Sequence, residues 1–436
     1  EEILRVTPRT NEFINEEWIS DKVRFNYDGY YQQRIDIPYI KKNQKLSSSS
    51  WEESLKILKN KLKSLKPLAL VGEHVDLETG YAINKFMSNF GKDNVECRTD
   101  NQAILENLDS YRFNTPLNEI ENSDLIILLG TNPKIETPII NHKIFKAYNN
   151  NSRIFNIGEN ISLNYQTEYL GDKLSNLNNE KLIKALKKSS NPLIIIGSAF
   201  LNKIKNIKTL KSIFSFADKY NVITKDKNNL NFLNPYASRV GQLILGNTTK
   251  NLCEPFSKLK KEKFEIVLSF GSEHIASEQF DNCFRVYFGH HGDEGAMKSD
   301  IILPTPLYTE KNGIFVNIEG RPQEAKKCHN PIGSSKEEWS IIKKLSDDLS
   351  FVFEPNTFDQ LRSELLKKFT KLSIFNETLS NDNASPIITD IEFEDCKTQY
   401  PINNFYMSDI ISKNSVTMVK CVEEIISTPS LLEKSA

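Results

Sequence analysis

Closely spaced cysteines are missing from this sequence. Its six cysteines lie at positions 97, 253, 283, 328, 396 and 421, and the nearest two are 25 positions apart. No CxxC or similar ligand spacing exists, so we do not expect an iron-sulfur or structural zinc site made by this chain alone. Thiols scattered in this way are typical of a protein in a reducing compartment.

An excess of charge of one sign and a long apolar run are also missing. The chain has 56 basic and 57 acidic residues and a formal net charge of -1, which argues against the basic surface of a nucleic-acid-binding protein. The longest apolar run, Pro192 to Leu201, is broken by Gly197 and Ser198. It is shorter than the ~18 to 20 residues of a membrane-spanning helix. We expect a soluble or peripheral protein whose partners are proteins.

The start of the chain lacks an initiator Met and a basic targeting segment. It reads Glu1-Glu2-Ile3-Leu4, so we expect either a trimmed chain or a subunit encoded in two pieces. The material for a large core is present, because 39% of the 436 residues are hydrophobic. A chain of this length should form more than one structural unit.

Short runs rich in Val, Ile and Leu, each ending in glycine, are the predicted strands. They are Leu68 to Gly72, Leu125 to Gly130, Ile154 to Gly158, Leu193 to Gly197, Phe264 to Gly271 and Phe284 to Gly289. Their core residues do not alternate strictly, as expected where helices cover both faces of a parallel sheet. The helical patterns between them predict an α/β fold of doubly wound, mostly parallel sheets. One such helix is expected over Trp51 to Leu65, with Ser50 as its N-cap.

Two polar stretches divide the chain. Residues 41–50 read as a linker, and residues 376–386 are rich in Asn, Asp and Ser and read as disordered. We therefore expect a front extension and linker over 1–50, an α/β body over 51–325 and a carboxy-terminal region over 326–436.

The loop Leu129 to Glu136 follows a predicted strand and has two interpretations. Thr131 or Asn132 could cap the next helix, with Pro133 in its first turn. Alternatively, ligands bind outside the carboxyl ends of parallel strands, where glycine lets backbone amides approach a phosphate. The loop also resembles the Gly-x-Asn-Pro loop of molybdopterin oxidoreductases. That resemblance implies that Gly130 and Asn132 correspond to positions beside the nucleotide part of a pterin cofactor.

A second loop, Gly289 to Gly295, holds His290, His291, Asp293 and Glu294. Imidazole and carboxylate groups after a strand could form a metal site or an acid-base pair. Adjacent loop residues seldom converge on one ion, so we favour a structural loop. Further on, Glu310 to Gln323 predicts a hairpin, with a turn at Asn312-Gly313, a strand whose Ile314, Val316 and Ile318 share a face, and a turn at Gly320.

Together, the segments Gly289 to Gly295, Ser299 to Pro304 and Tyr308 to Gln323 resemble the molybdopterin-oxidoreductase signature of the large iron-sulfur subunit of respiratory complex I. Pro8 to Gly29 and Phe405 to Val422 resemble the same family. The resemblance implies vestigial pterin-loop positions that bind no cofactor here: Gly130, Asn132, Glu310, Gly313, Asn317 and Gly320. It also implies that Ser20 stands where active relatives have a cluster cysteine, and a hydroxyl is a poor substitute for a thiolate.

The resemblance further implies a non-catalytic structural part of the peripheral arm of NADH:ubiquinone oxidoreductase, on the matrix side of the mitochondrial inner membrane. It implies no catalytic residue, metal or cofactor in this chain, with iron-sulfur clusters and FMN in partner chains. The expected partners are the cluster-bearing amino-terminal part of the same subunit and other peripheral-arm subunits. Asp21, Lys22 and Arg24 would then form a solvated or interdomain ion-pair cluster.

Alternatives remain for the front extension and for the function. The aromatic residues of the extension could anchor a partner or cover this chain's own sheet; they are Trp18, Phe25, Tyr27, Tyr30 and Tyr31. A rival hypothesis is an active pterin-dependent oxidoreductase that borrows its iron-sulfur cluster from another chain. A third hypothesis is an independent soluble protein that binds a nucleotide at Gly130 to Asn132.

Overall fold

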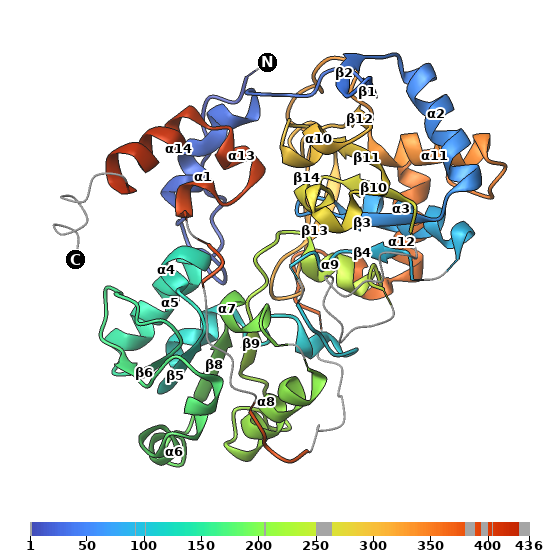
Figure 1. The fold of residues 1–436 in the computed structure, drawn as a ribbon. Coiled ribbons are helices and arrows are strands. Elements are labelled where there is room, and N and C mark those ends of the chain that lie inside the picture. Colours follow the sequence, from blue (N-terminus) through green and yellow to red (C-terminus); the bar gives the residue numbers. More distant parts are fainter. Residues whose placement is uncertain are drawn as a thin grey trace.

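The computed structural model describes residues 2–91, 93–100, 102–204, 206–249, 264–379, 389–393, 400–402 and 404–426. Within these residues the chain forms two open sheets of seven and five strands, a two-stranded hairpin sheet and a small lobe in which residues from the start and the end of the chain meet (Figure 1). We call this last part, residues 2–30 and 404–426, the terminal lobe.

The large sheet has seven strands in the order β2-β1-β12-β11-β10-β3-β4. Their bounds are β1 Tyr39–Lys42, β2 Lys45–Ser48, β3 Pro67–Val71, β4 Val95–Glu96, β10 Ile266–Phe270, β11 Phe284–Gly289 and β12 Ile301–Pro304. The strands from β12 to β4 are parallel, whereas β1 pairs antiparallel with both β12 and β2.

The linker predicted over residues 41–50 is wrong, because most of this stretch belongs to the β1-β2 hairpin at the edge of the large sheet. Tyr39 and Ile40 pair with Ile302 and Ile301 of β12. Every residue of β2 is exposed, so the strand needs no apolar side chains. A solvated edge strand of this kind has the composition of a linker.

The small sheet has five parallel strands in the order β7-β6-β5-β8-β9. Their bounds are β5 Leu125–Leu129, β6 Arg153–Ile157, β7 Glu168–Tyr169, β8 Pro192–Ile196 and β9 Leu230–Phe232. The whole small sheet is inserted in the sequence between β4 and β10 of the large sheet. All six strands predicted from the sequence are confirmed, as β3, β5, β6, β8, β10 and β11.

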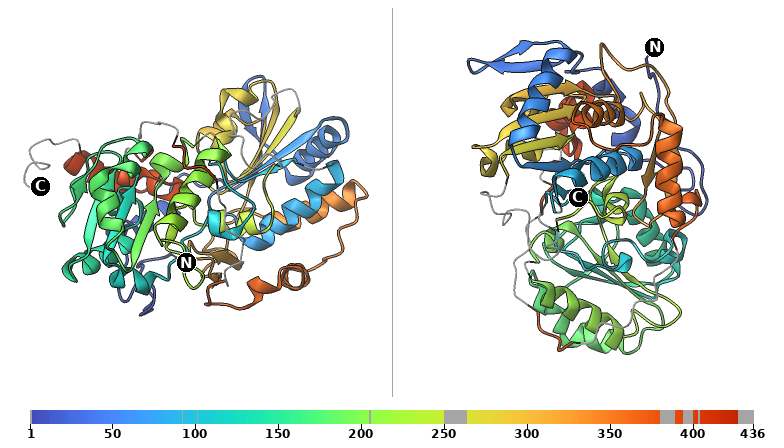
Figure 2. Two further views of the ribbon diagram at one scale, coloured as in Figure 1. Left: turned by 90° about the horizontal axis from the view of Figure 1, so that it is seen from below. Right: turned by 90° about the vertical axis from the view of Figure 1, so that its right-hand side faces the viewer.

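Helices cover both faces of each sheet (Figure 2). Around the large sheet lie α2 Trp51–Ser64, α3 Leu77–Met87, η2 Ser88–Phe90, α9 Arg239–Ile244, η8 Glu273–Ala276, η9 Glu278–Phe280, α10 Glu294–Lys298, α11 Glu338–Asp348, α12 Phe358–Lys368 and η10 Thr370–Ser373. Around the small sheet lie η4 Leu117–Asn122, α4 Pro133–Glu136, α5 Pro138–Asn149, η5 Leu174–Asn178, α6 Glu180–Leu186, α7 Ser198–Leu201 and α8 Ile207–Lys219. The short η3 Leu108–Ser110 packs through Leu108 into the core of the large sheet. The doubly wound α/β fold is therefore confirmed.

The predicted helix after Ser50 is confirmed as α2. The Ser50 hydroxyl accepts a hydrogen bond from the backbone N–H of Glu53, which is the capping contact expected from the sequence. The predicted hairpin is also present, as β13 Gly313–Val316 paired antiparallel with β14 Pro322–Ala325. Ile314 and Val316 are both buried, so this strand points its apolar face into the core.

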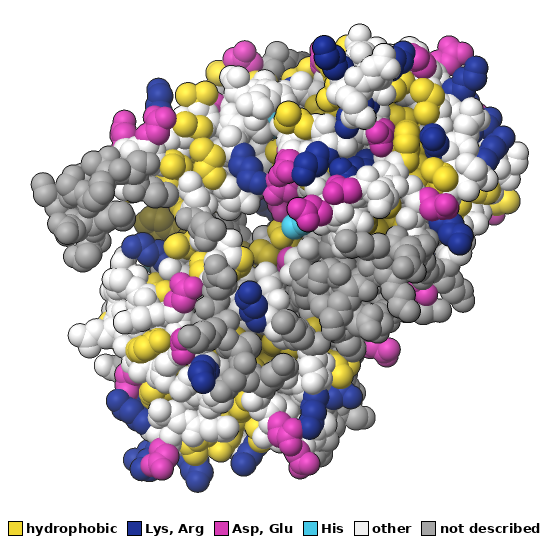
Figure 3. All heavy atoms as spheres, in the orientation of Figure 1, with side chains coloured by type: hydrophobic (Ala, Val, Ile, Leu, Met, Phe, Trp, Pro, Cys, Tyr) yellow, Lys and Arg dark blue, Asp and Glu magenta, His cyan; other side chains and the backbone are white. Residues whose placement is uncertain are grey.

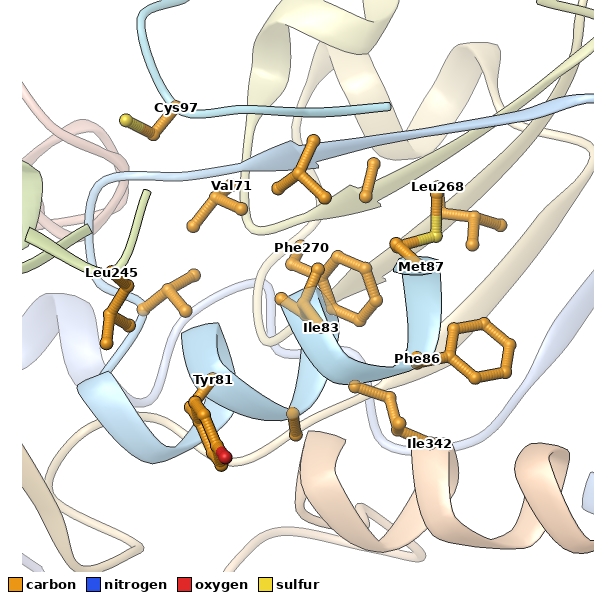
Figure 4. Close-up of a cluster of buried hydrophobic side chains, with 14 of the residues drawn as sticks. Val71, Tyr81, Ile83, Phe86, Met87, Cys97, Leu245, Leu268, Phe270 and Ile342 are labelled. Atoms are coloured by element: carbon orange, nitrogen blue, oxygen red, sulfur yellow. The ribbon is translucent and has the colours of Figure 1, made fainter. Parts of the chain in front are cut away.

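The main core lies between the large sheet and α3, with α11 on the outer side of that helix (Figure 4). Ile83 and Phe86 of α3 pack with Phe270 of β10 and Ile342 of α11 in one buried cluster. The rings of Phe270 and Phe288 are stacked, with centroids 4.4 Å apart. The part of residues 326–436 that holds α11 and α12 therefore packs as part of the large-sheet body.

The terminal lobe consists of α1 Asp21–Phe25, η1 Asn26–Tyr30, η11 Phe405–Met407, α13 Ile410–Lys413, α14 Val416–Cys421 and the π-turn η12 Val422–Ile426. Figure 1 shows α1 beside α13 and α14. The Asp28 carboxylate accepts hydrogen bonds from the N–H and hydroxyl of Thr417, at 2.9 and 3.0 Å. A Cβ added to Gly29 would lie 2.2 Å from the carbonyl oxygen of Ile411. Only glycine allows this approach between the two segments.

The stretch predicted to be disordered, 376–386, lies outside the described residues beyond position 379. In the part that is described, the Leu379 carbonyl accepts a hydrogen bond from Arg112. Of the helices in the described parts of the chain, none combines the length and apolarity needed to cross a membrane.

Candidate functional site

A cavity of about 1040 Å³ lies between the two sheets and the terminal lobe. Its wall is built from the loops after β3, β4 and β10 of the large sheet and after β5, β8 and β9 of the small sheet. Residues of α1, η11 and α13 complete it. Figure 3 shows acidic and basic side chains gathered around the hollow in the middle of this face. Ligands of open α/β folds bind at such carboxyl edges.

Carboxyl groups dominate the charged side chains of this wall. Among the described lining residues, five are acidic and one is a lysine. Three carboxylates each hold one cation: Asp100 with Arg239 at 2.9 Å, Glu273 with Lys413 at 2.8 Å, and Asp409 with Lys22 at 3.0 Å. The second pair joins the terminal lobe to the large-sheet body, and the third joins the two halves of the lobe.

The other two carboxyl groups, Glu73 and Glu136, have no cation partner within the described residues. Burial and then the nearby carboxylates of Glu273 and Asp409 raise the pKa of Glu73 from 4.5 to about 8. Burial also raises the pKa of Glu136 to about 7, although hydrogen bonds from Tyr400 and Ser198 oppose this. Both groups therefore hold a proton at or near neutral pH.

The Gly130 loop lies beside the cavity and is covered by the chain's own Tyr400. The Asn132 N–H donates a hydrogen bond to the Tyr400 hydroxyl at 3.0 Å, and this hydroxyl also lies 3.1 Å from the Asn132 carbonyl oxygen. Gly130 has a φ of +60°, and a Cβ there would lie 2.4 Å from the Phe200 ring. Asn132 occupies the N-cap position of α4 as predicted, but its side chain makes no capping hydrogen bond.

None of the six predicted pterin-loop positions is among the residues that line the cavity. Glu310 is completely buried and forms a two-pronged salt bridge with Arg34, with N–O distances of 2.8 and 2.7 Å. Its carboxylate also accepts a hydrogen bond from the backbone N–H of Leu307. Glu310 thus holds the front of the chain against the loop before β13.

The remaining three positions shape the β13-β14 hairpin. Gly313 begins β13, and a Cβ there would lie 2.7 Å from the side chain of Asp76. The Asn317 side chain accepts hydrogen bonds from the N–H groups of Glu319 and Arg321 within the connecting turn. Gly320 supplies the φ of +84° that this turn needs. These contacts give each residue a structural role, and the pterin-loop correspondence stays a prediction.

The adjacent histidines after β11 contact one another and the terminal lobe. The His291 Nε2–H donates to the carbonyl oxygen of Gly29 at 2.8 Å, which leaves its Nδ1 to accept from His290. Arg34 donates to the His290 carbonyl. Burial lowers the pKa of both histidines, to about 4 for His291. Two neutral imidazoles of this kind join segments rather than carry charge.

The carboxylates of the same loop also have structural partners. Asp293 caps α10 by accepting from the Ala296 N–H at 2.7 Å, and it accepts from the Tyr287 hydroxyl at 2.8 Å. Glu294 pairs with Lys298 one turn later, at 3.0 Å. Within the described parts of the chain, no group of three His, Cys, Asp or Glu side chains is placed to hold a metal ion.

Ser20 lies on the cavity wall, where it begins α1. Its hydroxyl accepts a hydrogen bond from the Val23 N–H at 3.3 Å, as an N-cap residue does. Lys22, in the first turn, pairs with Asp409, so the predicted ion-pair cluster includes at least one contact between distant segments. The correspondence of Ser20 to a cluster cysteine stays a prediction.

Several residues of the cavity were not found from the sequence. Glu73 directly follows Gly72 at the end of a predicted strand, so the rule that ligands bind at carboxyl edges could have identified it. Asp409 lines the cavity, whereas Tyr400 and Arg239 contact residues of its loops; none of the three follows a predicted strand, and only Asp409 lies in a segment that carries the family resemblance. Their role depends on contacts with residues more than a hundred positions away.

The cavity does not fit the pterin nucleotide that the resemblance implies. Such a cofactor carries phosphate groups, which proteins hold with backbone N–H groups, lysine or arginine. Here the Asn132 N–H is already bonded to Tyr400, and the wall carries five acidic residues against one lysine. The backbone donor is thus occupied, and the lysine of the wall, Lys22, is paired with Asp409, so neither is available to a phosphate.

Known family patterns match almost the whole chain. The pattern described as Molybdopterin oxidoreductase matches residues 34–348. The pattern described as NADH-ubiquinone oxidoreductase NDSU1/NuoG-like, 4Fe-4S domain, matches residues 1–28. A third pattern, for the C-terminal part of an NADH-ubiquinone oxidoreductase subunit, matches residues 376–421.

Full-length relatives carry related names. An NADH-quinone oxidoreductase subunit of Rickettsia bellii is 37% identical over 97% of this chain and 62% of its own length. The NADH-ubiquinone oxidoreductase 75 kDa subunit of Reclinomonas americana is 34% identical over 96% of this chain and 64% of its length. The mitochondrial 78 kDa subunit of Candida albicans is 33% identical over 97% and 61%. The chain therefore spans less than two thirds of the relatives it matches.

Solved structures share the fold at low identity. A chain of the formyltransferase/hydrolase complex of Methylorubrum extorquens superposes with a TM-score of 0.50 and 11% identity, covering 76% of this chain and 99% of that one. At this identity the likeness concerns the fold alone.

Proposed function

The chain belongs to the molybdopterin oxidoreductase family, and from this membership and its named relatives we propose that it is a structural part of NADH:ubiquinone oxidoreductase rather than an enzyme. The proposal that the chain is not an enzyme rests on the contact between Tyr400 and Asn132. This contact occupies a backbone N–H group of the loop that would face the pterin nucleotide in an active relative.

Redox chemistry then belongs to partner chains. We propose that iron-sulfur clusters and FMN are held by the cluster-bearing amino-terminal part of the subunit and by other peripheral-arm subunits. The six widely spaced cysteines and the hydroxyl of Ser20 support this assignment. The name of one relative includes the word mitochondrial, and we propose for this chain a place on the matrix side of the inner membrane.

The terminal lobe is the proposed docking surface for the cluster-bearing partner. Of the aromatic residues expected in the front extension, Tyr30 is buried and its hydroxyl is hydrogen-bonded to that of Tyr308 at 2.6 Å. Trp18 and Phe25, in contrast, are 56% and 47% exposed. Val416 of α14 adds an exposed apolar side chain to the same lobe. Exposed apolar side chains of this kind are frequent in protein interfaces.

A family relationship supports this choice of partner. Residues 1–28 match the pattern of an iron-sulfur domain, and the chain covers only 62% of a relative's length. A surface that continues an iron-sulfur domain is expected to pack against the rest of that domain. Part of the front extension packs on the chain's own small-sheet layer, where the centroid of the Trp18 ring lies 5.6 Å from that of His142 in α5, and its exposed aromatic surface is the part that we assign to the interface.

Purification from a native source tests the proposal. A tagged chain should migrate on a native gel with NADH dehydrogenase activity and bring cluster-containing subunits with it. Metal analysis of the isolated chain should find neither molybdenum nor tungsten in stoichiometric amount. Stoichiometric metal would support the rival pterin-dependent oxidoreductase, and a chain that always migrates alone would support an independent binding protein.

A further inference from the structure

The cavity between the sheets has a surplus of hydrogen-bond acceptors. Three of its carboxylates each have a single cation, whereas the Glu73 carboxyl group accepts no hydrogen bond and forms no ion pair with a described residue. Glu73 also lies close to two of the paired carboxylates, those of Glu273 and Asp409. An added positive charge at this point would be attracted by all three carboxyl groups, and this attraction must exceed the repulsion from the nearby Lys413 and Arg239.

Unpartnered oxygen atoms on buried side chains give a second, independent indication. The side chain of Asp100 is 5% exposed and lines the cavity, and its Oδ2 has no hydrogen-bond partner among the described residues. Asn26, which also lines the cavity, is 8% exposed, and its Oδ1 is likewise without a described partner. Buried polar atoms normally have partners, so these two point to a ligand that donates hydrogen bonds.

We propose that this cavity binds a small organic cation, a polyamine-type amine, with the carboxylate of Glu73 as its principal acceptor. An ammonium group supplies both missing properties, a positive charge and several N–H donors. A single metal ion fits poorly, because no three suitable ligands converge within the described residues. The cavity, at about 1040 Å³, has room for an extended molecule with more than one amine.

Binding of such a cation is linked to the proton on Glu73. The charged and titratable groups around this side chain are Glu273, Asp409, Lys413, Arg239, Tyr236 and Tyr287. Because burial and the carboxylates raise the pKa of Glu73 to about 8, the ammonium must displace a proton at neutral pH. The affinity should therefore increase as the pH rises toward 8 and level off above it.

Calorimetric titration of the full chain with spermidine, at constant ionic strength, tests the proposal. From pH 6.5 to 7.5 the affinity should rise by roughly tenfold, because one proton is displaced below the pKa of Glu73. Glu73→Gln should weaken binding at pH 8.5 by about tenfold or more and remove the pH dependence. Glu73→Asp, which keeps the charge, should retain the pH dependence. Glu52→Gln removes one charge from the exposed face of α2 and should leave binding unchanged.

Three results would overturn the proposal. Equal spermidine affinity in the wild-type chain and Glu73→Gln would remove the assigned acceptor. Equal or tighter binding of Mg²⁺ alone would indicate a metal site, and tight binding of inorganic phosphate would indicate an anion site. If Glu73→Gln does not fold, the pH series on the wild-type chain and Glu73→Asp still decides, because a flat profile contradicts the proposal.

Discussion

The hydroxyl of Tyr400 lies 3.0 Å from the backbone nitrogen of Asn132, although 268 positions separate the two residues in the sequence. The contact brings the carboxy-terminal segment to the carboxyl end of β5. It uses the backbone donor that, in a doubly wound fold, is otherwise free to meet a phosphate. A residue of the chain itself thus takes the place of a ligand group.

Tyr400→Phe should destabilise the protein by about 0.5 to 1.5 kcal/mol, because the Asn132 N–H loses its partner without a large change in packing. Urea unfolding, followed by circular dichroism, measures this as a lower midpoint. Tyr169→Phe is the matched control, since Tyr169 is exposed on β7 and should tolerate the change. If both variants unfold at the wild-type midpoint, the contact does not hold the carboxy-terminal segment in place.

The buried pair of Arg34 and Glu310 should be among the most sensitive positions of the chain. Their side chains are 3% and 0% exposed, so Glu310→Gln leaves a buried guanidinium without its counter-charge. We expect a loss of about 3 to 5 kcal/mol in unfolding free energy, as found for other broken buried pairs. Glu53→Gln, which breaks the exposed pair with Lys42, should have little effect. Similar midpoints for the two variants would contradict this ranking.

Individual strands and helices were predictable where a pattern of neighbouring residues in the sequence indicates them. Runs such as Leu125 to Leu129 are buried on both faces, so the sequence shows them as continuous apolar stretches. The division of the strands between two sheets was not predictable, because the small sheet interrupts the large one between β4 and β10. Nothing within β3 or β5 indicates to which sheet it belongs.

The candidate site was predictable only in part, because it is assembled from distant segments. Gly130 and Asn132 were found from a motif, and they lie beside the cavity. The pair of Lys22 and Asp409 joins the two ends of the chain, and no periodicity or spacing reports such a contact. Tyr400 likewise lies in a stretch without a recognisable pattern. A site formed by three separate parts of the chain can be identified only from the structure.

Glu73 should contribute a loss of stability as the pH rises from about 5 to 8, and buried histidines such as His291, whose pKa is lowered, contribute the opposite change at the acidic end of this range. Folded Glu73 has a pKa of about 8, whereas its ordinary value is 4.5, so between these values folding takes up a proton. The contribution is at most about 1.4 kcal/mol for each pH unit. Urea unfolding at pH 5, 6.5 and 8 should therefore show that the stability of the wild-type chain falls relative to that of Glu73→Gln as the pH rises. Glu52→Gln should follow the wild type, and parallel profiles for all three would show that Glu73 is not shifted.

The apolar surface of the terminal lobe should determine capture of the cluster-bearing partner. Phe25 of α1 and Val416 of α14 are 47% and 50% exposed, so Phe25→Ala with Val416→Ala should leave the isolated fold largely unchanged. Central apolar contacts of an interface often contribute more than about 1 kcal/mol each, so the double variant should bind the partner at least about tenfold more weakly. Pull-down of cluster-containing subunits, followed by affinity measurement, gives the comparison. Val352→Ala, which alters an exposed residue far along the chain between α11 and α12, should bind like the wild type. Undiminished capture by the double variant would place the interface elsewhere on the molecule.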